Sequence, residues 1–231
     1  NECANRGLRQ KMGKIQHCLI MAAGRGQRMM PLTEKVPKPM APHNGSTLIA
    51  NQINKLSKFI PNIHVTVGYK GPVLAEHVIA SNVTSVIHTA GQSNSWWIHN
   101  TLLSYVDEPV YIMTCDNIAE LDFELLEKDY NEQSRPPCML IGVKPAPGLN
   151  GDYIFHDNFR VYKLDRNEPA PTYCSGIQII NPFQVKKITK NVGDFYNVWG
   201  QLIEQNRLWV SSVLPDKWFS VDTVEHLQQL S

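Results

Sequence analysis

The stretch from Ile15 to Met40 constrains the fold of this chain more than any other. A short apolar run is followed by Ala-Ala-Gly-Arg-Gly-Gln-Arg-Met at residues 22–29. The run is typical of a buried strand that ends in a tight turn. Small residues let the backbone approach a ligand closely, and the amide groups of such a turn can point at one anion. We interpret residues 22–26 as a phosphate-binding loop.

Cationic side chains follow this loop. Arg28 lies two residues after the second glycine, and Lys38 stands between Pro37 and Pro39. Proline fixes its own φ and biases the preceding residue toward extended geometry, so Lys38 is presented from a stiff backbone. Arginine can bind two phosphate oxygens at once. The alternative for both cations is a solvated surface position.

A Gly-x-Gly turn after a strand is, by itself, equally compatible with a structural turn. The wider set is more specific, because Pro-x-Thr follows at residues 31–33 and Pro-Lys-Pro at residues 37–39. Together these motifs resemble the signature of the sugar-phosphate nucleotidylyltransferases, which join a nucleoside triphosphate to a phosphorylated small molecule and release pyrophosphate. The chain looks most like their compact single-domain branch, whose members act on amino-sugar 1-phosphates or on phosphocholine-like acceptors.

Two aspartates are the predicted Mg²⁺ ligands. Asp116 ends an apolar run at residues 110–115, and Asp222 follows another at residues 218–221. Each matches a family carboxylate, one at the end of the central strand and one before the last helix. Mg²⁺ prefers oxygen ligands and usually takes one or two carboxylates with phosphates and water. A turn or helix cap is the alternative for both, and it is stronger for Asp222 because Thr223 and a helix follow. We expect both carboxylates to be exposed.

The resemblance implies in-line attack of an acceptor phosphate oxygen on the α-phosphorus of the nucleotide. This nucleophile is already an anion at neutral pH, so the reaction needs neutralisation of charge rather than a general base. By resemblance, Arg28 contacts the β and γ phosphates and Lys38 bridges the phosphates near the reacting centre. The predicted nucleotide contacts are Ala22, Ala23, Gly24, Arg25, Gly26 and Gln92.

The acceptor is expected to be a sugar 1-phosphate, whose hydroxyls need hydrogen-bonding groups. Phosphocholine is the alternative, because Trp96, Trp97 and Tyr173 could form an aromatic cage, although the two tryptophans also suit a core or pocket wall. A nucleotide sensor without turnover is a further alternative. The predicted acceptor contacts are Asn94, Trp97, Tyr173, Ser175 and Gly176.

The chain departs from the family pattern in three places. The central strand ends in Cys115-Asp116 where relatives carry Gly-Asp, and the last motif, at residues 221–223, lacks a glycine that many relatives carry. The family lysine within Glu-Lys-Pro is also missing, because Asn-Glu-Pro stands at residues 167–169. Arg166 or Lys144 is left to anchor the acceptor phosphate.

Composition argues against polyanionic partners. The 22 basic and 21 acidic residues give a net charge of +1, which provides no global field for nucleic acid or an anionic membrane. No apolar run approaches the roughly 20 residues of a membrane span, and no signal peptide is recognisable. Five cysteines without paired metal-ligand spacing fit a reducing compartment. We expect a cytoplasmic monomer or homodimer that binds neither nucleic acid nor membrane.

Strand and helix patterns alternate over the first two thirds of the chain. This order predicts an α/β fold, a three-layer Rossmann-like domain with a mostly parallel mixed central sheet. We expect a leader at residues 1–11, one nucleotidyltransferase domain at 12–231, and an acceptor-side subregion at about 145–180 with a hairpin. Helices are expected at residues 49–60, 73–80, 96–105, 123–130, 194–205 and 224–230.

Overall fold

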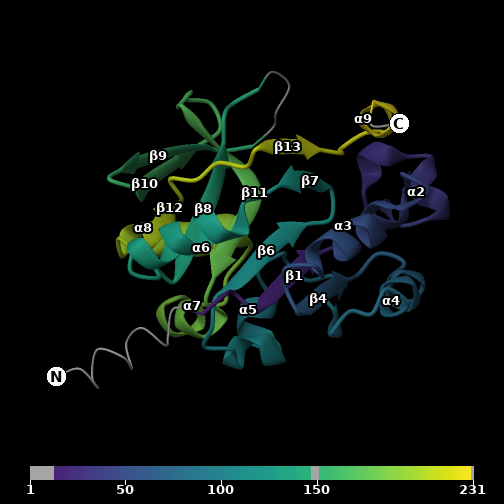
Figure 1. The fold of residues 1–231 in the computed structure, drawn as a ribbon, viewed down its shortest axis with the longest axis horizontal. Helices are drawn as coiled ribbons and strands as arrows, with labels where there is room; N and C mark the ends of the chain where they lie inside the picture. Colours follow the sequence, from purple (N-terminus) through teal and green to yellow (C-terminus); the bar gives the residue numbers. More distant parts are fainter. Residues whose placement is uncertain (1–12, 147–150, 230–231) are drawn as a thin grey trace.

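The computed structural model describes residues 13–146 and 151–229, so the predicted leader lies outside the described residues. Within them a nine-stranded sheet runs in the order β5-β4-β1-β6-β11-β8-β12-β10-β9 (Figure 1). Strands β10 and β11 run against the others, which confirms the predicted mostly parallel mixed sheet. In sheet order, the strands are β5 (Ser85–His88), β4 (Asn62–Val67), β1 (His17–Met21), β6 (Val110–Thr114), β11 (Thr172–Ile180), β8 (Cys138–Val143), β12 (Leu208–Val210), β10 (Arg160–Asp165) and β9 (Tyr153–Asp157).

Helices cover both faces of the sheet, as predicted for three layers. Neighbouring strand residues point to opposite faces, so Ile20 packs into one core cluster and Leu19 into the other. The first cluster contains side chains of α3 (Leu48–Leu56), α4 (Gly71–Ile79) and α6 (Phe123–Glu132). The second contains side chains of α5 (Trp97–Asn100), η3 (Leu102–Tyr105), α7 (Pro182–Ile188) and α8 (Phe195–Glu204).

Side-chain caps explain where several helices begin. Thr47 accepts a hydrogen bond from the backbone at the start of α3, and Asp194 caps α8 where the sequence predicts it. The single helix predicted over residues 96–105 is wrong, because Thr101 is extended (φ −126°, ψ 171°) and separates α5 from η3. The Thr101 hydroxyl donates to the Trp97 carbonyl at 2.8 Å, and this local bond replaces the continuing helix.

A third, smaller core cluster joins the segment after the phosphate loop to the C-terminal segment. Buried Met29, Ala41, Leu48 and Val221 form it. Around it lie η1 (Gln27–Met29), α2 (Leu32–Lys35), η2 (Lys38–Met40), the β2 (Pro42–His43) and β3 (Ser46–Thr47) pair, and α9 (Val224–Gln228). Figure 1 shows α9 beside α2, although they are far apart in sequence. This packing brings the residue after Val221 to the phosphate loop.

A two-stranded sheet of β7 and β13 lies beside the nine-stranded sheet. Strand β13 (Lys217–Ser220) pairs antiparallel with β7 (Asn117–Glu120), and Ser220 lies opposite Asn117. The residues just after β13 therefore lie beside those just before β7. Strands β9 and β10 form the predicted hairpin. The division into one domain with an acceptor-side subregion stays a prediction. No helix among residues 13–146 and 151–229 is long and apolar enough to cross a membrane.

Candidate active site

The loop after β1 is fastened to the carboxyl end of β4. The Ala22 amide donates to the Thr66 carbonyl at 3.2 Å and lies 3.1 Å from the Thr66 hydroxyl. The Tyr69 amide donates to the Ala23 carbonyl at 3.0 Å. A Cβ at Gly68 would lie 2.7 Å from that same carbonyl oxygen, so only glycine permits this approach. The loop is therefore held rigidly at the edge of the sheet where ligands of open α/β folds bind.

Gly26 brings the end of this loop against Lys38. Its φ is +65°, and a Cβ there would lie only 2.6 Å from the Lys38 Cβ. The Thr33 hydroxyl donates to the Gly26 carbonyl at 3.0 Å and fixes the turn. Glycine is required both for the left-handed conformation and for the close contact. The sequence motif thus places the Lys38 side chain beside the phosphate loop.

Four charged side chains meet at one end of the site. The Lys38 Nζ lies 2.7 Å from the Asp116 carboxylate and 3.4 Å from an Asp222 oxygen. The Arg28 guanidinium donates to that same Asp222 oxygen at 2.8 Å. Lys38 is only 9% exposed. Burial by itself lowers the Lys38 pKa, but the charge and hydrogen bond of Asp116, together with Asp222, more than offset this and raise the pKa overall. Lys38 is therefore a cation at neutral pH.

The fold directs both aspartates toward these cations. The Val221 amide donates to the Asp116 carbonyl at 2.9 Å, which joins the two aspartate-bearing segments. Thr223, and not Asp222, caps α9, so the capping alternative for Asp222 is wrong. The side chains of Asp116 and Asp222 are 22% and 25% exposed. The expectation of exposed carboxylates is wrong because both pack against the Lys38 ammonium.

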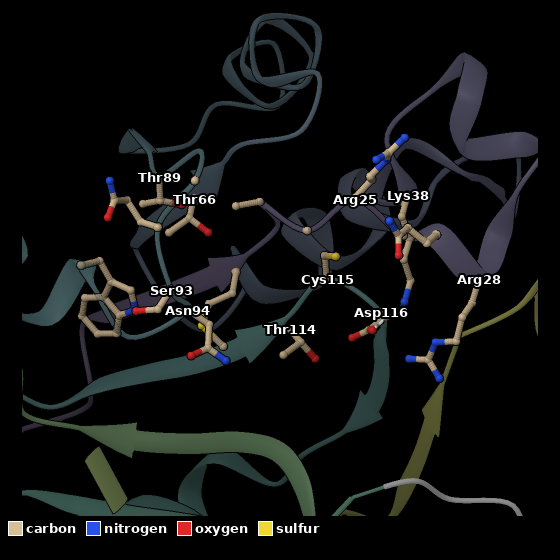
Figure 2. A pocket seen from close by; sticks show the side chains of 18 of the residues that line it. Arg25, Arg28, Lys38, Thr66, Thr89, Ser93, Asn94, Thr114, Cys115 and Asp116 are labelled. Atoms are coloured by element: carbon tan, nitrogen blue, oxygen red, sulfur yellow. Dashed lines mark hydrogen bonds and ion pairs between the residues drawn. The ribbon is translucent and has the colours of Figure 1, made fainter. Parts of the chain in front are cut away.

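These groups line one open cavity of about 560 Å³. Figure 2 shows its two ends, with Arg28, Lys38 and Asp116 at one and Thr66 and Thr89 at the other. We call these the charged end (Arg28, Lys38, Asp116 and Asp222) and the uncharged end (Thr66, Thr89, Ser93 and Asn94). The predicted site residues that line the cavity are Ala23, Gly24, Arg25, Gly26, Arg28, Lys38, Gln92, Asn94, Trp97, Asp116 and Asp222.

Four predicted site residues are not among those that line this cavity. Ala22 is 1% exposed, and its amide is already hydrogen-bonded. Tyr173 packs edge-on against Tyr153, with ring centroids 5.3 Å apart. The Ser175 hydroxyl donates to a strand carbonyl, and Gly176 follows with a φ of +85°. An acceptor role for Tyr173, Ser175 and Gly176, and a nucleotide contact for Ala22, stay predictions.

Several other residues line the cavity although the sequence did not single them out. Thr66 and Thr114 lie at the carboxyl ends of β4 and β6, and Thr89 follows β5. The rule that ligands of open α/β sheets bind at the carboxyl ends of the strands could have found all three. The lining residues outside the predicted contacts are Met21, Gln27, Thr66, Thr89, Gly91, Ser93, Thr114 and Cys115.

The charged end has the donor set for one hard cation. Asp116 and Asp222 both contact the Lys38 Nζ, so oxygens of both carboxylates can reach a shared positive charge. Within the described ranges, no three His, Cys, Asp or Glu side chains cluster in a way that could hold a metal. A cation held here would therefore take its remaining ligands from substrate and water. This donor set suits Mg²⁺ better than Zn²⁺, which favours His and Cys ligands.

The chain is similar in sequence to several proteins named as nucleotidyltransferases. The mannose-1-phosphate guanyltransferase of Debaryomyces hansenii is 22% identical over 218 residues, which is 88% of this chain and 60% of that protein. The 2-aminoethylphosphonate cytidylyltransferase of Lancefieldella rimae is 25% identical over 188 residues, or 80% and 74% of the two chains. The present chain spans 60% or less of the length of three of the curated relatives that it matches.

Solved structures share the fold. The CTP:phosphocholine cytidylyltransferase of Streptococcus pneumoniae superposes with a TM-score of 0.72 at 18% identity, covering 93% of this chain and 96% of the other. This similarity confirms the Rossmann-like architecture. A family model described as "MobA-like NTP transferase domain" matches residues 18–138, more than half of the chain, including the phosphate loop, Lys38 and Asp116. The chain therefore belongs to the family of MobA-like NTP transferase domains.

Proposed function

We propose that this chain transfers a nucleotidyl group from a nucleoside triphosphate to a phosphorylated small molecule in an Mg²⁺-dependent reaction. An oxygen of the acceptor phosphate attacks the α-phosphorus and forms the new bond. The bond from the α-phosphorus to the oxygen that bridges to the β-phosphate breaks, and pyrophosphate leaves with the electron pair. The observation that carries this proposal is the convergence of Arg28, Lys38, Asp116 and Asp222 beside the phosphate loop.

The charged end can perform this reaction through an exchange of partners. Without substrate, Lys38 and Arg28 are neutralised by the two carboxylates. When triphosphate enters, its oxygens offer the cations new anionic partners, which frees Asp116 and Asp222. These two carboxylates would hold Mg²⁺. The ion would supply positive charge that offsets repulsion between the two phosphates. Lys38 then stabilises charge near the reacting phosphorus, and Arg28 stabilises charge on the departing pyrophosphate.

We propose a sugar 1-phosphate as the acceptor. Support comes from the curated relatives, which include a mannose-1-phosphate guanyltransferase. Neutral hydrogen-bonding groups of the cavity, such as Ser93 and Asn94, suit sugar hydroxyls or a nucleobase. Aromatic enclosure is weaker than the sequence predicts, because Trp97 lines the cavity while Trp96 and Tyr173 are not among its lining residues.

Cytidylyl transfer to a small non-sugar phosphate or phosphonate is the second candidate. It is favoured by the similarity, over 80% of the chain, to a protein named as a 2-aminoethylphosphonate cytidylyltransferase. In that case the acceptor carries an amine or a quaternary ammonium group. Such a cation is recognised by an aromatic face or a carboxylate rather than by an array of hydroxyl partners.

One experiment separates these possibilities. Pyrophosphate release is measured with four nucleoside triphosphates, each combined with several sugar 1-phosphates, phosphocholine and 2-aminoethylphosphonate, with Mg²⁺ or with EDTA. We expect turnover with one sugar 1-phosphate and none in EDTA. Turnover restricted to CTP with phosphocholine or the phosphonate would select the second candidate. Nucleotide binding without pyrophosphate release from any pair would identify a sensor and overturn the enzymatic proposal.

We propose that the reaction takes place in the cytoplasm, where nucleoside triphosphates are available. The four cysteines among the described residues are free thiols, which suits a reducing compartment. Sedimentation analysis with and without added nucleic acid tests the remaining predictions, that the chain is a monomer or homodimer and that it binds no polyanion.

A further inference from the structure

The two-stranded ribbon of β7 and β13 adjoins both proposed Mg²⁺ ligands. Asp116 lies immediately before β7, and Asp222 lies two residues after the end of β13. The hydrogen bond from the Val221 amide to the Asp116 carbonyl ties the two segments together. An isolated pair of strands is only marginally stable in water. The position of this ribbon, and of its two carboxylates, therefore depends on what holds it against the rest of the fold.

One backbone carbonyl of the large sheet accepts hydrogen bonds from both strands of the ribbon. The Asn117 Nδ2, in β7, donates to the Ser175 carbonyl at 2.8 Å. The Trp218 Nε1, in β13, donates to the same oxygen at 3.1 Å. Asn117 and Ser175 are 5% and 3% exposed, so this contact is shielded from water. We call Ser175 with these two donors the ribbon clasp, and in Figure 1 the ribbon lies beside β11.

A bulge in β11 makes this carbonyl available. Strand β11 pairs with β6 at residues 178–180, and its register against β8 shifts between Cys174 and Ile177. Residues in a bulge leave the regular ladder, so their backbone groups can bond elsewhere. The Ser175 hydroxyl accepts from the Ile177 amide at 3.0 Å and donates to the Ile141 carbonyl, which fixes the shape of the bulge.

Gly176 leaves room for the amide donor of the clasp. Its φ is +85°, and a Cβ there would lie only 3.0 Å from the Asn117 Nδ2. Any other side chain at 176 would be strained in its backbone and would press on that amide. The clasp thus accounts for glycine at this position.

We propose that Asn117, Trp218 and the Ser175 carbonyl are positioning groups, which set where the ribbon lies and thereby place the carboxylates of Asp116 and Asp222 beside the phosphate loop. None of the three clasp residues is among those that line the nucleotide cavity in the described part of the chain. The clasp therefore acts through the ribbon and not on the substrate. Its effect on turnover rests on the proposed function, whereas its effect on the ribbon does not.

The first test follows the ribbon without any substrate. Trp218→Phe and Asn117→Leu each remove one N–H donor and keep a side chain of similar form. Hydrogen–deuterium exchange of the full chain is measured by mass spectrometry. Exchange at residues 117–120 and 217–222 should become at least about tenfold faster, and exchange in β1 and β4 should change less than about twofold. Unchanged exchange in the ribbon, or equal acceleration throughout the chain, would overturn the proposal.

Trp199→Phe is the matched control. The Trp199 Nε1 donates to the Gln178 Oε1 at 3.0 Å, so this variant loses the same kind of bond from α8 instead of from the ribbon. It should leave exchange in the ribbon unchanged even where its melting temperature falls as far. Acceleration of the ribbon in this control as well would contradict a specific role of the clasp. Should one clasp variant fail to fold, the other decides, because both remove a donor to the same carbonyl.

Turnover provides the second test. Each clasp variant should need at least about threefold more Mg²⁺ for half-maximal release of pyrophosphate, and kcat should fall at least about fivefold. The KM values for the triphosphate and the acceptor should stay within about twofold, because neither residue lines the cavity. A change confined to the KM for the acceptor would make Asn117 and Trp218 acceptor contacts and would overturn the proposal. If the unmodified chain released no pyrophosphate, the proposed function would fail, and the exchange test would still decide whether the clasp holds the ribbon.

Discussion

The two ends of the nucleotide cavity are built in different ways. At the charged end, Arg28, Lys38, Asp116 and Asp222 neutralise one another before any substrate is present. At the uncharged end, Thr66 and other neutral side chains line a wall whose groups are partly committed to the fold. The charged end is thus a set of reactive groups that are paired with one another until substrate binds. The uncharged end is a surface whose shape selects a ligand.

This difference has an energetic consequence. Removing a charge at one end leaves a largely buried ion pair less well compensated, which affects both folding and chemistry. Removing a neutral group at the other end leaves hydrogen bonds unmade but unbalances no buried charge. We therefore expect losses of turnover at the charged end to exceed those at the uncharged end by at least about tenfold.

The largest effect is expected for Asp116→Asn and Asp222→Asn. Each removes a proposed Mg²⁺ ligand, so turnover should fall by about 10³-fold or more. Each also weakens an ion pair with Lys38, and the melting temperature should drop by roughly 2–4 °C, equivalent to about 1 kcal/mol. Pyrophosphate release over a range of Mg²⁺ concentrations, with calorimetry in parallel, measures both changes.

Asp216→Asn is the matched control, because Asp216 is exposed in the same C-terminal segment. It should leave turnover and melting temperature unchanged. Turnover near the unmodified value in Asp116→Asn or Asp222→Asn would show that the residue is not a metal ligand. Loss of turnover together with loss of the folded state would show that the charged end stabilises the fold rather than takes part in the reaction.

The next largest effect is expected for Arg28→Ala and Lys38→Ala. Each removes one preorganised cation, which should lower turnover by roughly 10²-fold. The loss should appear in kcat as well as KM, because the charge is needed most in the transition state. Lys35→Ala is the control, since Lys35 is exposed in α2. A change confined to KM would show that the residue contributes to substrate binding and not to stabilisation of the transition state.

The same contrast explains what the sequence could predict about the site. The residue types and sequence motifs of Lys38 and Asp116 predict their roles. In the structure the Lys38 Nζ lies 2.7 Å from the Asp116 Oδ2. Thr66 and Thr89 carry no such signal, because threonine is common in strands and their contribution depends on position at a strand end. The contacts of Tyr173 could not be predicted, because they depend on how the hairpin of β9 and β10 packs on β11.

The fold was predictable for a related reason. Apolar periodicity and caps such as Asp194 are local signals, and they gave the strands, most helices and the class of sheet. The break at Thr101 is also local, but one side-chain hydrogen bond decides it against the helical pattern. Pairing of β13 with β7 is non-local, and it is this pairing that brings Asp222 to Asp116.

A smaller effect is expected at the uncharged end. Asn94→Ala should raise the KM for the acceptor about tenfold by leaving a substrate hydroxyl without its partner. The KM for the nucleoside triphosphate should remain nearly constant. Because the Asn94 Oδ1 also accepts a hydrogen bond from the Phe195 amide at 2.9 Å, stability is measured alongside the kinetics. Trp97→Leu should mainly lower stability. Equal changes in the two KM values for Asn94→Ala would show that Asn94 does not bind the acceptor.

The smallest effect on turnover is expected away from both ends, at His64 in β4. His64 is 6% exposed, and burial, followed by the neighbouring His17, lowers its pKa to about 4. Below about pH 6.5 the unfolded chain binds a proton that the folded chain excludes, so stability should fall as the pH drops toward about 4, by on the order of 2 kcal/mol. His64→Gln should flatten this dependence in urea unfolding, while His88→Gln, at an exposed position of β5, should not. Turnover at pH 7.5 should stay within about twofold of the unmodified chain, since His64 is uncharged there. If the unfolding profile between pH 4 and 6.5 is the same with and without His64, this histidine is not the group that titrates. A large loss of turnover in His64→Gln would contradict the expectation that turnover depends on the two ends of the cavity rather than on the interior of the sheet.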